Sequence, residues 1–78
     1  MTLDQLPQGK VAVVQSLTIQ GELRRRLMDL GFVPGAQVEV EMRNPLGDPR
    51  AFRVMGSVVA LRREQAAGIT IALSEESR

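Results

Sequence analysis

One stretch decides the fold of this 78-residue chain: "LMDLGFVPGAQVEV", residues 27–40. Its first half has the spacing of a short helix, and Gly31 follows at once. A glycine at this point predicts a helix stop, in which Gly31 takes a left-handed conformation and Phe32 packs back on Leu27. The stretch therefore predicts a sharp corner after a helix.

The second half of the same stretch turns the chain into a strand. Pro34 and Gly35 predict a type II turn, because proline presets φ and glycine accepts a positive φ. Residues 37–43 then alternate between apolar and polar, which is typical of a half-buried strand. The apolar positions of this strand are Val38, Val40 and Met42.

Upstream of the corner, the sequence predicts a strand over residues 10–17 and a helix over residues 22–30. Leu3 and Leu6 precede Pro7 and indicate a short turn tucked against the body of the domain. The helix should face the core with a narrow stripe of leucines, Leu23, Leu27 and Leu30.

Downstream, "NPLGDP" (44–49) is a loop, because its prolines, glycine and aspartate cannot continue a strand ladder. Residues 50–55 predict the next strand, and Gly56-Ser57 fits a two-residue type II′ hairpin turn. That turn would place Met55 opposite Val58 and Val54 opposite Val59. The core face of the hairpin would then consist of Phe52, Val54, Val59 and Leu61.

The C-terminal part contains "RREQAAG" (62–68), which predicts one helical turn, and "ITIAL" (69–73), which predicts a last strand with Ile69, Ile71 and Leu73 on one face. Residues 74–78 are expected to form a flexible polar tail after a single domain, 1–73. The fold class is mainly β: about five strands, one short α-helix after the first strand and a one-turn helix before the last. Five short strands close most economically as a small barrel.

Composition limits the chemistry. The chain has no Cys and no His, so it offers no thiolate site and no side chain with an ordinary pKa near neutrality. No serine has an evident activating base, so the sequence indicates no enzyme and no cofactor. No apolar run is long enough to span a bilayer, so direct membrane insertion is not expected. The lack of Cys fits a cytoplasmic location.

Three segments together resemble the FeoA family: "RRRLMDLGFVPGAQVEV" (24–40), "NPLGDP" (44–49) and "VMGSVVALRREQAAGITI" (54–71). The resemblance implies the stand-alone form of an SH3-like barrel that serves bacterial ferrous iron uptake. It also implies a partner, the membrane iron transporter FeoB, with a cytoplasmic GTP-binding domain.

Two sets of residues are candidates for binding that partner. Arg24, Arg25 and Met28 lie on the helix face opposite the leucines, and Met and Arg suit adaptable interfaces. In the loop, Leu46 lies at an exposed tip and Asp48 lies near it. A solvated helix face and a loop that folds back on the barrel are the alternatives.

Other motif residues are interpreted as structural. Arg26 borders the apolar stripe, follows Glu22 by four residues, and matches the family's Arg-Leu pair; its stem should cover the core edge. Arg62 matches the family's Ala-Leu-Arg segment and is interpreted in the same way. The structural set is Arg26, Leu27, Gly31, Phe32, Pro34, Gly35 and Arg62.

Glu39, Glu41 and Asp48 are the only arrangement that suggests a metal, and a solvated polar strand face is the favoured interpretation, so no metal site is expected. Met55, Val58 and Ala60 form an outward apolar set. It is either an open interaction patch or a surface covered by the N-terminal leucines, and the sequence favours coverage.

The sequence thus predicts a protein-binding module that docks on FeoB and regulates it by shifting its conformational equilibrium. One alternative is a small nucleic-acid-binding barrel, which Phe32, Phe52 and a net charge of +1 support poorly, so no nucleic acid partner is expected. Another is a self-associating adaptor, a weak homo-oligomer formed through a strand edge or the Met55/Val58 face.

Overall fold

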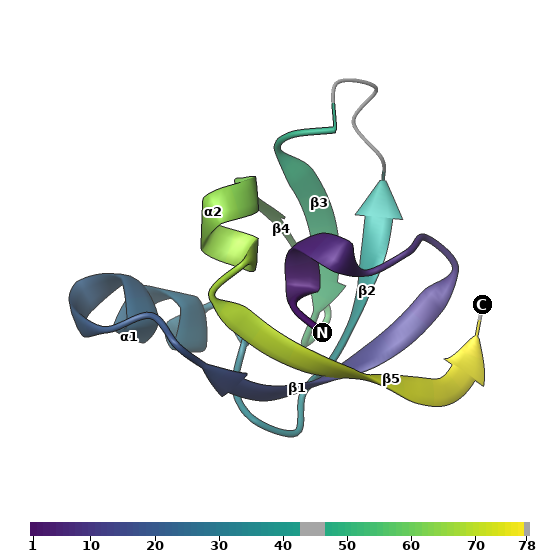
Figure 1. The fold of residues 1–78 in the computed structure, drawn as a ribbon, viewed down its shortest axis with the longest axis horizontal. Helices are drawn as coiled ribbons and strands as arrows, with labels where there is room; N and C mark the ends of the chain where they lie inside the picture. The colour runs from purple at the N-terminus through teal and green to yellow at the C-terminus, as the bar shows by residue number, and fades with distance from the viewer. Residues whose placement is uncertain (43–46, 78) are drawn as a thin grey trace.

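The computed structural model describes residues 1–42 and 47–77 and contains five strands and three short helical segments (Figure 1). The elements in chain order are η1 (Leu3–Gln5), β1 (Lys10–Leu17), α1 (Gly21–Asp29), β2 (Gln37–Met42), β3 (Arg50–Val54), β4 (Ser57–Leu61), α2 (Arg63–Ala66) and β5 (Ile69–Ser77). The fold class is as predicted, mainly β with short helices after the first strand and before the last.

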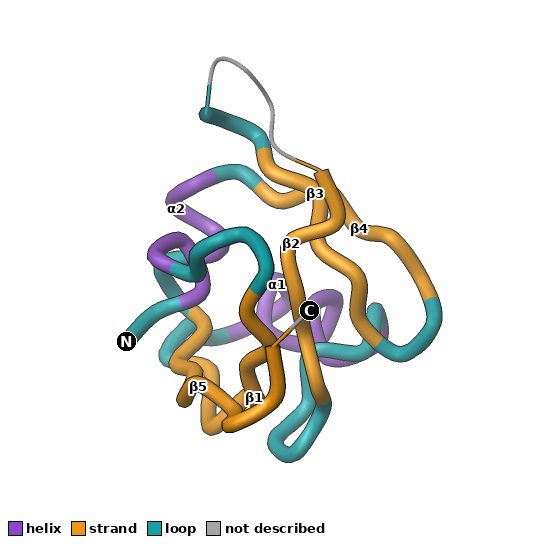
Figure 2. Tube along the Cα trace, turned by 90° about the vertical axis from the view of Figure 1, so that its right-hand side faces the viewer, coloured by secondary structure: helices purple, strands orange, loops and turns teal. Residues whose placement is uncertain are grey.

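The strands form one antiparallel sheet in the order β4-β3-β2-β1-β5. The sheet curls, so that β1 and β5 lie together on one side of the molecule while β3 and β4 lie on the other (Figure 2). The helix α1 projects beside the sheet, at the left in Figure 1. Strands β4 and β5 are the two ends of the sheet.

The corner after α1 has the predicted geometry. Gly31 has a φ of 113°, and its N–H donates to the carbonyl of Met28 at 3.0 Å. The N–H of Phe32 donates to the carbonyl of Leu27, also at 3.0 Å. These two bonds define a Schellman ending, and both Leu27 and Phe32 are buried in the core.

The turn that follows also agrees with prediction. The N–H of Ala36 donates to the carbonyl of Val33 at 3.0 Å, and Gly35 has a φ of 93°. The turn is tied to the first strand by two backbone hydrogen bonds. The N–H of Gly35 donates to the carbonyl of Val14 at 2.8 Å, and the N–H of Val14 donates to the carbonyl of Ala36 at 2.9 Å. This tie fixes where β2 begins.

The core fills the centre of the curled sheet with side chains from every element. The N-terminal segment closes it, since Leu3 and Leu6 are 0% and 1% exposed. Arg50 holds this segment in place: its Nη1 donates to the Asp4 carbonyl at 2.8 Å and its Nη2 to the Leu6 carbonyl at 2.6 Å. The other large buried side chains are Phe32, Phe52, Leu27, Ile69 and Ile71.

The predicted hairpin turn between β3 and β4 is wrong. The turn residues are Met55 and Gly56, with φ of 51° and 78°, and not Gly56-Ser57. Val54 lies opposite Ser57, and Phe52 lies opposite Val59. The rule that glycine occupies the first turn position failed because Met55 accepts a left-handed conformation. The observed register differs from the predicted one by two residues. Because side chains alternate between the two faces of a strand, the same residues still face the core.

Two leucines are more exposed than predicted. Leu30 is 38% exposed because it is the C-cap residue, where the chain leaves the helix. Leu73 is 48% exposed and lies on β5 two residues beyond the buried Ile71. The strand continues to Ser77, opposite Lys10, so pairing extends into the predicted tail. The division between domain 1–73 and tail 74–78 stays a prediction.

Candidate functional site

The polar face of α1 is less open than its sequence predicts. Arg24 is half-buried, and its Nη1 donates to the Leu17 carbonyl at 2.9 Å, which ties the helix to the end of β1. Met28 is also half-buried and packs against the core, whereas Arg25 is exposed. Arg24 and Met28 are thus partly covered by the body of the domain, and the docking role of Arg24, Arg25 and Met28 stays a prediction. A shallow hollow on this face is lined by Gly21, Glu22, Arg24, Arg25, Met28 and Asp29.

The loop residue Asp48 also has a structural contact. Its Oδ1 accepts a hydrogen bond from the N–H of Arg63 at 2.9 Å, at the first residue of α2. An acceptor there satisfies a backbone donor that a helix start leaves open. Leu46 lies outside the described residues. Docking roles for Leu46 and Asp48 stay predictions.

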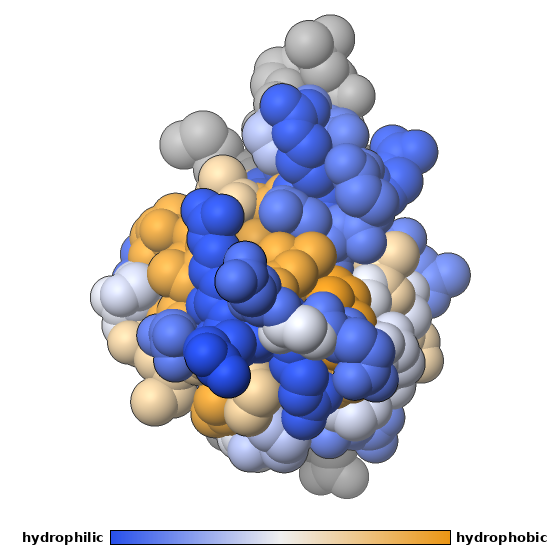
Figure 3. Space-filling model, turned by 90° about the vertical axis from the view of Figure 1, so that its left-hand side faces the viewer, coloured by the Kyte–Doolittle hydropathy of each residue, from blue (hydrophilic) through white to orange (hydrophobic). Residues whose placement is uncertain are grey.

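A groove runs between α1 and the edge strand β4, and most of the residues that line it are apolar. Leu23, Leu27 and Leu30 form its helical wall and residues 58–61 form its strand wall, with Gln65 at one end. Arg26 is exposed on the helical side. Arg26 lines the groove, and no ion pair joins it to Glu22 in residues 1–42 and 47–77. Figure 3 views the molecule from the α1 side and shows hydrophobic surface on either side of a band of hydrophilic side chains.

The apolar set Met55, Val58 and Ala60 is open. Met55 is 68% exposed and Val58 is 52% exposed. The prediction that Leu3 and Leu6 cover this set is wrong, because both leucines are inserted into the core. The physical reason is Arg50, whose bonds hold the N-terminal segment over the core.

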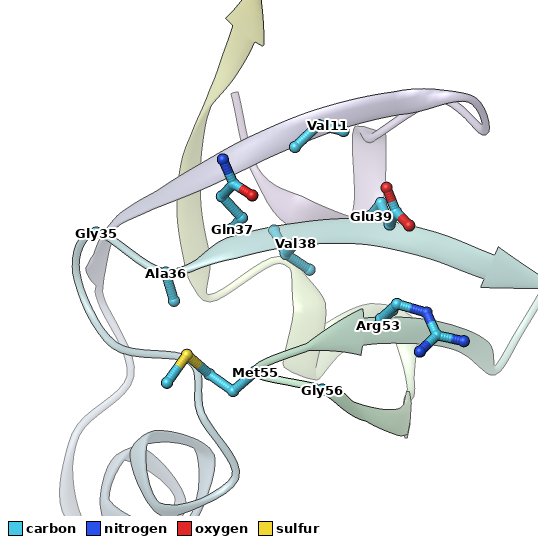
Figure 4. A pocket seen from close by; sticks show the side chains of 9 residues that line it. All are labelled: Val11, Gly35, Ala36, Gln37, Val38, Glu39, Arg53, Met55 and Gly56. Carbon is cyan, nitrogen blue, oxygen red and sulfur yellow. The ribbon is translucent and has the colours of Figure 1, made fainter. Parts of the chain in front are cut away.

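A second hollow lies beside the corner and was not predicted from the sequence. It is formed by β1, the turn before β2, β2 itself and the β3–β4 hairpin, and its lining residues are Val11, Gly35, Ala36, Gln37, Val38, Glu39, Arg53, Met55 and Gly56. Met55 reaches towards the turn at Gly35 and Ala36, while Gln37 and Glu39 lie along β2 (Figure 4). This hollow was missed because the predicted hairpin register was wrong, and that register determines the position of Met55.

The charges on the outer face of β2 and β3 pair with each other. Arg53 Nη2 lies 2.6 Å from Glu41 Oε1, and Arg53 Nε donates to Glu41 Oε2 at 2.8 Å. These hydrogen bonds and the charge of Arg53 lower the pKa of Glu41. The hydrogen bond and charge of Glu41, followed by the charge of Glu39, raise the pKa of Arg53.

The carboxylates considered for a metal are not brought together. Glu41 is paired with Arg53, and Asp48 is bonded to the backbone of α2. Among the residues with described positions, no three Asp, Glu, His or Cys side chains lie close enough to hold an ion. The two phenylalanines, Phe32 and Phe52, are both 0% exposed and cannot stack on a base.

Arg62, which was interpreted as a structural residue, lies directly before α2. Arg62 is exposed, and its N–H donates to Gln65 Oε1 at 2.9 Å, at the start of α2. The structural roles of Arg26 and Arg62 stay predictions.

No helix in the described part of the chain has the length and apolar character that a membrane crossing requires.

Comparisons with known proteins agree with this geometry. The sequence profile of the FeoA domain matches residues 1–73. A protein of Porphyromonas gingivalis described as an Fe(2+) transport protein A/Fe(2+) transporter FeoB fusion protein is 40% identical over 73 residues, which is 94% of this chain and 9% of the fusion. The chain therefore spans only a small part of that relative.

Two solved structures give the fold. The solution structure of the FeoA protein of Chlorobium tepidum is 42% identical, with a TM-score of 0.86 over 94% of this chain and 70% of that one. The crystal structure of Stenotrophomonas maltophilia FeoA complexed with zinc is 34% identical, with a TM-score of 0.82 over 92% and 89% of the two chains. The second protein is described as an SH3 domain protein, so the predicted SH3-like class is confirmed.

Proposed function

Because the chain belongs to the FeoA family, we propose that it is an accessory protein of ferrous iron uptake that docks on a FeoB-type membrane transporter and regulates it. The observation that carries this proposal is the P. gingivalis relative, in which FeoA and FeoB are joined in one polypeptide. Covalent fusion keeps two domains at a high local concentration, which is useful when they bind each other.

The surface supports a protein partner. Val58 and Leu30 are large apolar side chains exposed at the α1–β4 groove, and Met55 is exposed at the β3–β4 hairpin beside it. A small protein rarely leaves such side chains grouped on one side unless a partner covers them. The buried state of both phenylalanines weighs against the alternative of a nucleic-acid-binding barrel.

The regulatory mechanism follows from binding alone. A partner that binds one conformation of the transporter more tightly than another shifts the transporter towards that conformation. Such a mechanism requires no catalytic group from this chain. The docking site on the transporter is proposed to be cytoplasmic, and Arg25 on the exposed face of α1 would contribute to the rim of the interface.

The test is the affinity of the purified chain for the detergent-solubilised FeoB-type transporter of the same genome. We expect saturable binding that Val58→Asp weakens at least about tenfold, since it places a charge in the apolar contact (about 1.4 kcal/mol). The matched control is Gln15→Asp, the same new carboxylate at an exposed position of β1. Absence of saturable binding by the parent chain would refute the proposal.

A further inference from the structure

Strand β4 is an end of the sheet, and its register shows which of its backbone groups are unused. β4 pairs with β3, and no other strand pairs with it in residues 1–42 and 47–77. Val54 and Ser57 flank a two-residue turn and therefore form a hydrogen-bonded pair, and in an antiparallel ladder such pairs alternate with non-bonded ones. Consequently, the N–H and C=O groups of Val58 and Ala60 point outward from the edge.

The outward groups lie along the groove between α1 and β4. Val58 and Ala60 line it together with the leucines of α1. An extended segment placed against β4 would satisfy these backbone groups, and its alternate side chains would enter the groove and contact the partly exposed Leu23 and Leu30. The groove thus combines the two requirements of strand addition: a free edge for main-chain bonds and a pocket for side chains.

The charge of the groove indicates what that segment carries. Arg26 is the one charged residue among those that line the groove in the described structure. The chain that leaves β4 continues with Arg62 and Arg63, which are also exposed. A carboxylate at the matching position of the added segment would neutralise Arg26, and a guanidinium–carboxylate contact gives geometric specificity.

A second copy of the chain suits the edge less well. The β4 segment "SVVAL" contains no acidic residue, so pairing of two β4 edges would leave each Arg26 without a carboxylate from the added strand. Strand addition by a partner segment that alternates apolar residues and includes an Asp or Glu is therefore favoured over self-association.

We propose that β4 binds an extended, apolar and acidic segment of the partner protein as a sixth strand, with a carboxylate of that segment facing Arg26. This inference rests on the proposed function, because it specifies how the transporter is held. The probe is again the detergent-solubilised FeoB-type transporter, titrated with variants of the full chain.

The decisive variant is Ala60→Pro, which removes one outward N–H and leaves the bonds to β3 in place, since proline is tolerated at an edge position whose N–H faces solvent. We expect Ala60→Pro to lose at least about tenfold in affinity while Ala60→Val, which keeps the N–H, stays within about twofold of the parent. Arg26→Glu should also lose about tenfold or more. If Ala60→Pro does not fold, Val58→Pro replaces it, because the Val58 N–H has the same direction.

The outcomes separate the two proposals. Parent-like binding by the folded proline variant would overturn strand addition and leave docking intact. Parent-like binding by Arg26→Glu would overturn the acidic character of the segment. No binding by the parent would overturn both proposals. Sedimentation that shows a dimer lost in the proline variant, with transporter affinity unchanged, would assign the edge to self-association and would also overturn strand addition.

Discussion

Two apolar surfaces of this small barrel differ in how far their side chains are exposed to solvent. On one side, Leu3 and Leu6 of η1 close the core and are fully buried, and Arg50 secures them through two backbone carbonyls. On the other side, Met55 and Val58 at the β3–β4 hairpin remain exposed. The N-terminal segment thus covers the core on one side, while no described segment covers Met55 and Val58, and this difference is the basis for proposing that a partner binds there.

The largest expected difference between the sides is in stability. Leu6→Ala should lower the free energy of unfolding by about 2–5 kcal/mol, because it leaves a cavity in a closed core. Val58→Ala should change it by about 0.5 kcal/mol or less, because the side chain already contacts water. Urea unfolding of the two variants measures the contrast. Equal losses would show that Val58 belongs to the core and not to a docking surface.

The next prediction concerns the residue that holds the covered side closed. Arg50→Ala removes two charge-assisted bonds and the stacking of the guanidinium 5.4 Å from the centre of the Phe52 ring. The expected loss is about 1.5–3 kcal/mol. Arg53→Ala is the matched control on the same strand, because Arg53 is exposed and its ion pair is with a surface carboxylate. Its loss of stability should be clearly smaller. A loss for Arg50→Ala no larger than the control would contradict the closing role.

The third prediction concerns the contact between Gly31, at the corner after α1, and Met55, on the exposed side of the molecule. A Cβ built on Gly31 would lie 2.9 Å from Met55 Cγ, and Gly31 also has a positive φ. Gly31→Ala should therefore lower the free energy of unfolding by about 1–2 kcal/mol because of its backbone conformation. The close contact with Met55 should lower it further. Gly56→Ala is the control, since Gly56 has a positive φ and nothing within 4 Å of the added atom.

A double variant isolates the contact. Met55→Ala combined with Gly31→Ala should recover the part of the loss that exceeds the Gly56→Ala value, as measured by a double-mutant cycle in urea. If the double variant recovers none of the lost stability, Met55 moves aside at no cost in free energy. In that case, the orientation of Met55 would not depend on the corner.

These positions also show what the sequence could predict. The Schellman ending, the type II turn and the alternation of β2 depend on neighbouring residues, so the local pattern predicted them correctly. The hairpin turn was predicted at Gly56-Ser57 because the rule places glycine first, and nothing local reveals that Met55 adopts φ of 51°. The second hollow was missed for the same reason.

The fate of the N-terminal leucines could not be predicted locally either. It depends on Arg50, which is 46 residues from Asp4 in the sequence. Arg24 was predicted to lie on the helix face opposite the leucines, and a helical wheel shows only the direction of a side chain. Its bond to the Leu17 carbonyl depends on how α1 packs against the end of β1.

The smallest expected effect is the pH dependence of the surface pair between Glu41 and Arg53. The pKa of Glu41 is lower in the folded chain than its ordinary value, so the pair contributes stability above the unfolded pKa. That contribution is lost as pH falls through the folded pKa. Urea midpoints between about pH 3 and 7 should fall less steeply with acid in Glu41→Gln than in the parent. An identical slope would show that the pair contributes nothing.

The most direct test of the central claim is hydrogen exchange of the two sides with and without the FeoB-type transporter. If the open side is the docking surface, backbone amides in residues 57–61 become at least about tenfold slower to exchange when the transporter is added, and those in residues 3–6 do not change. Slower exchange at residues 3–6 with residues 57–61 unchanged would contradict the claim, because the partner would then bind the side that the chain already covers.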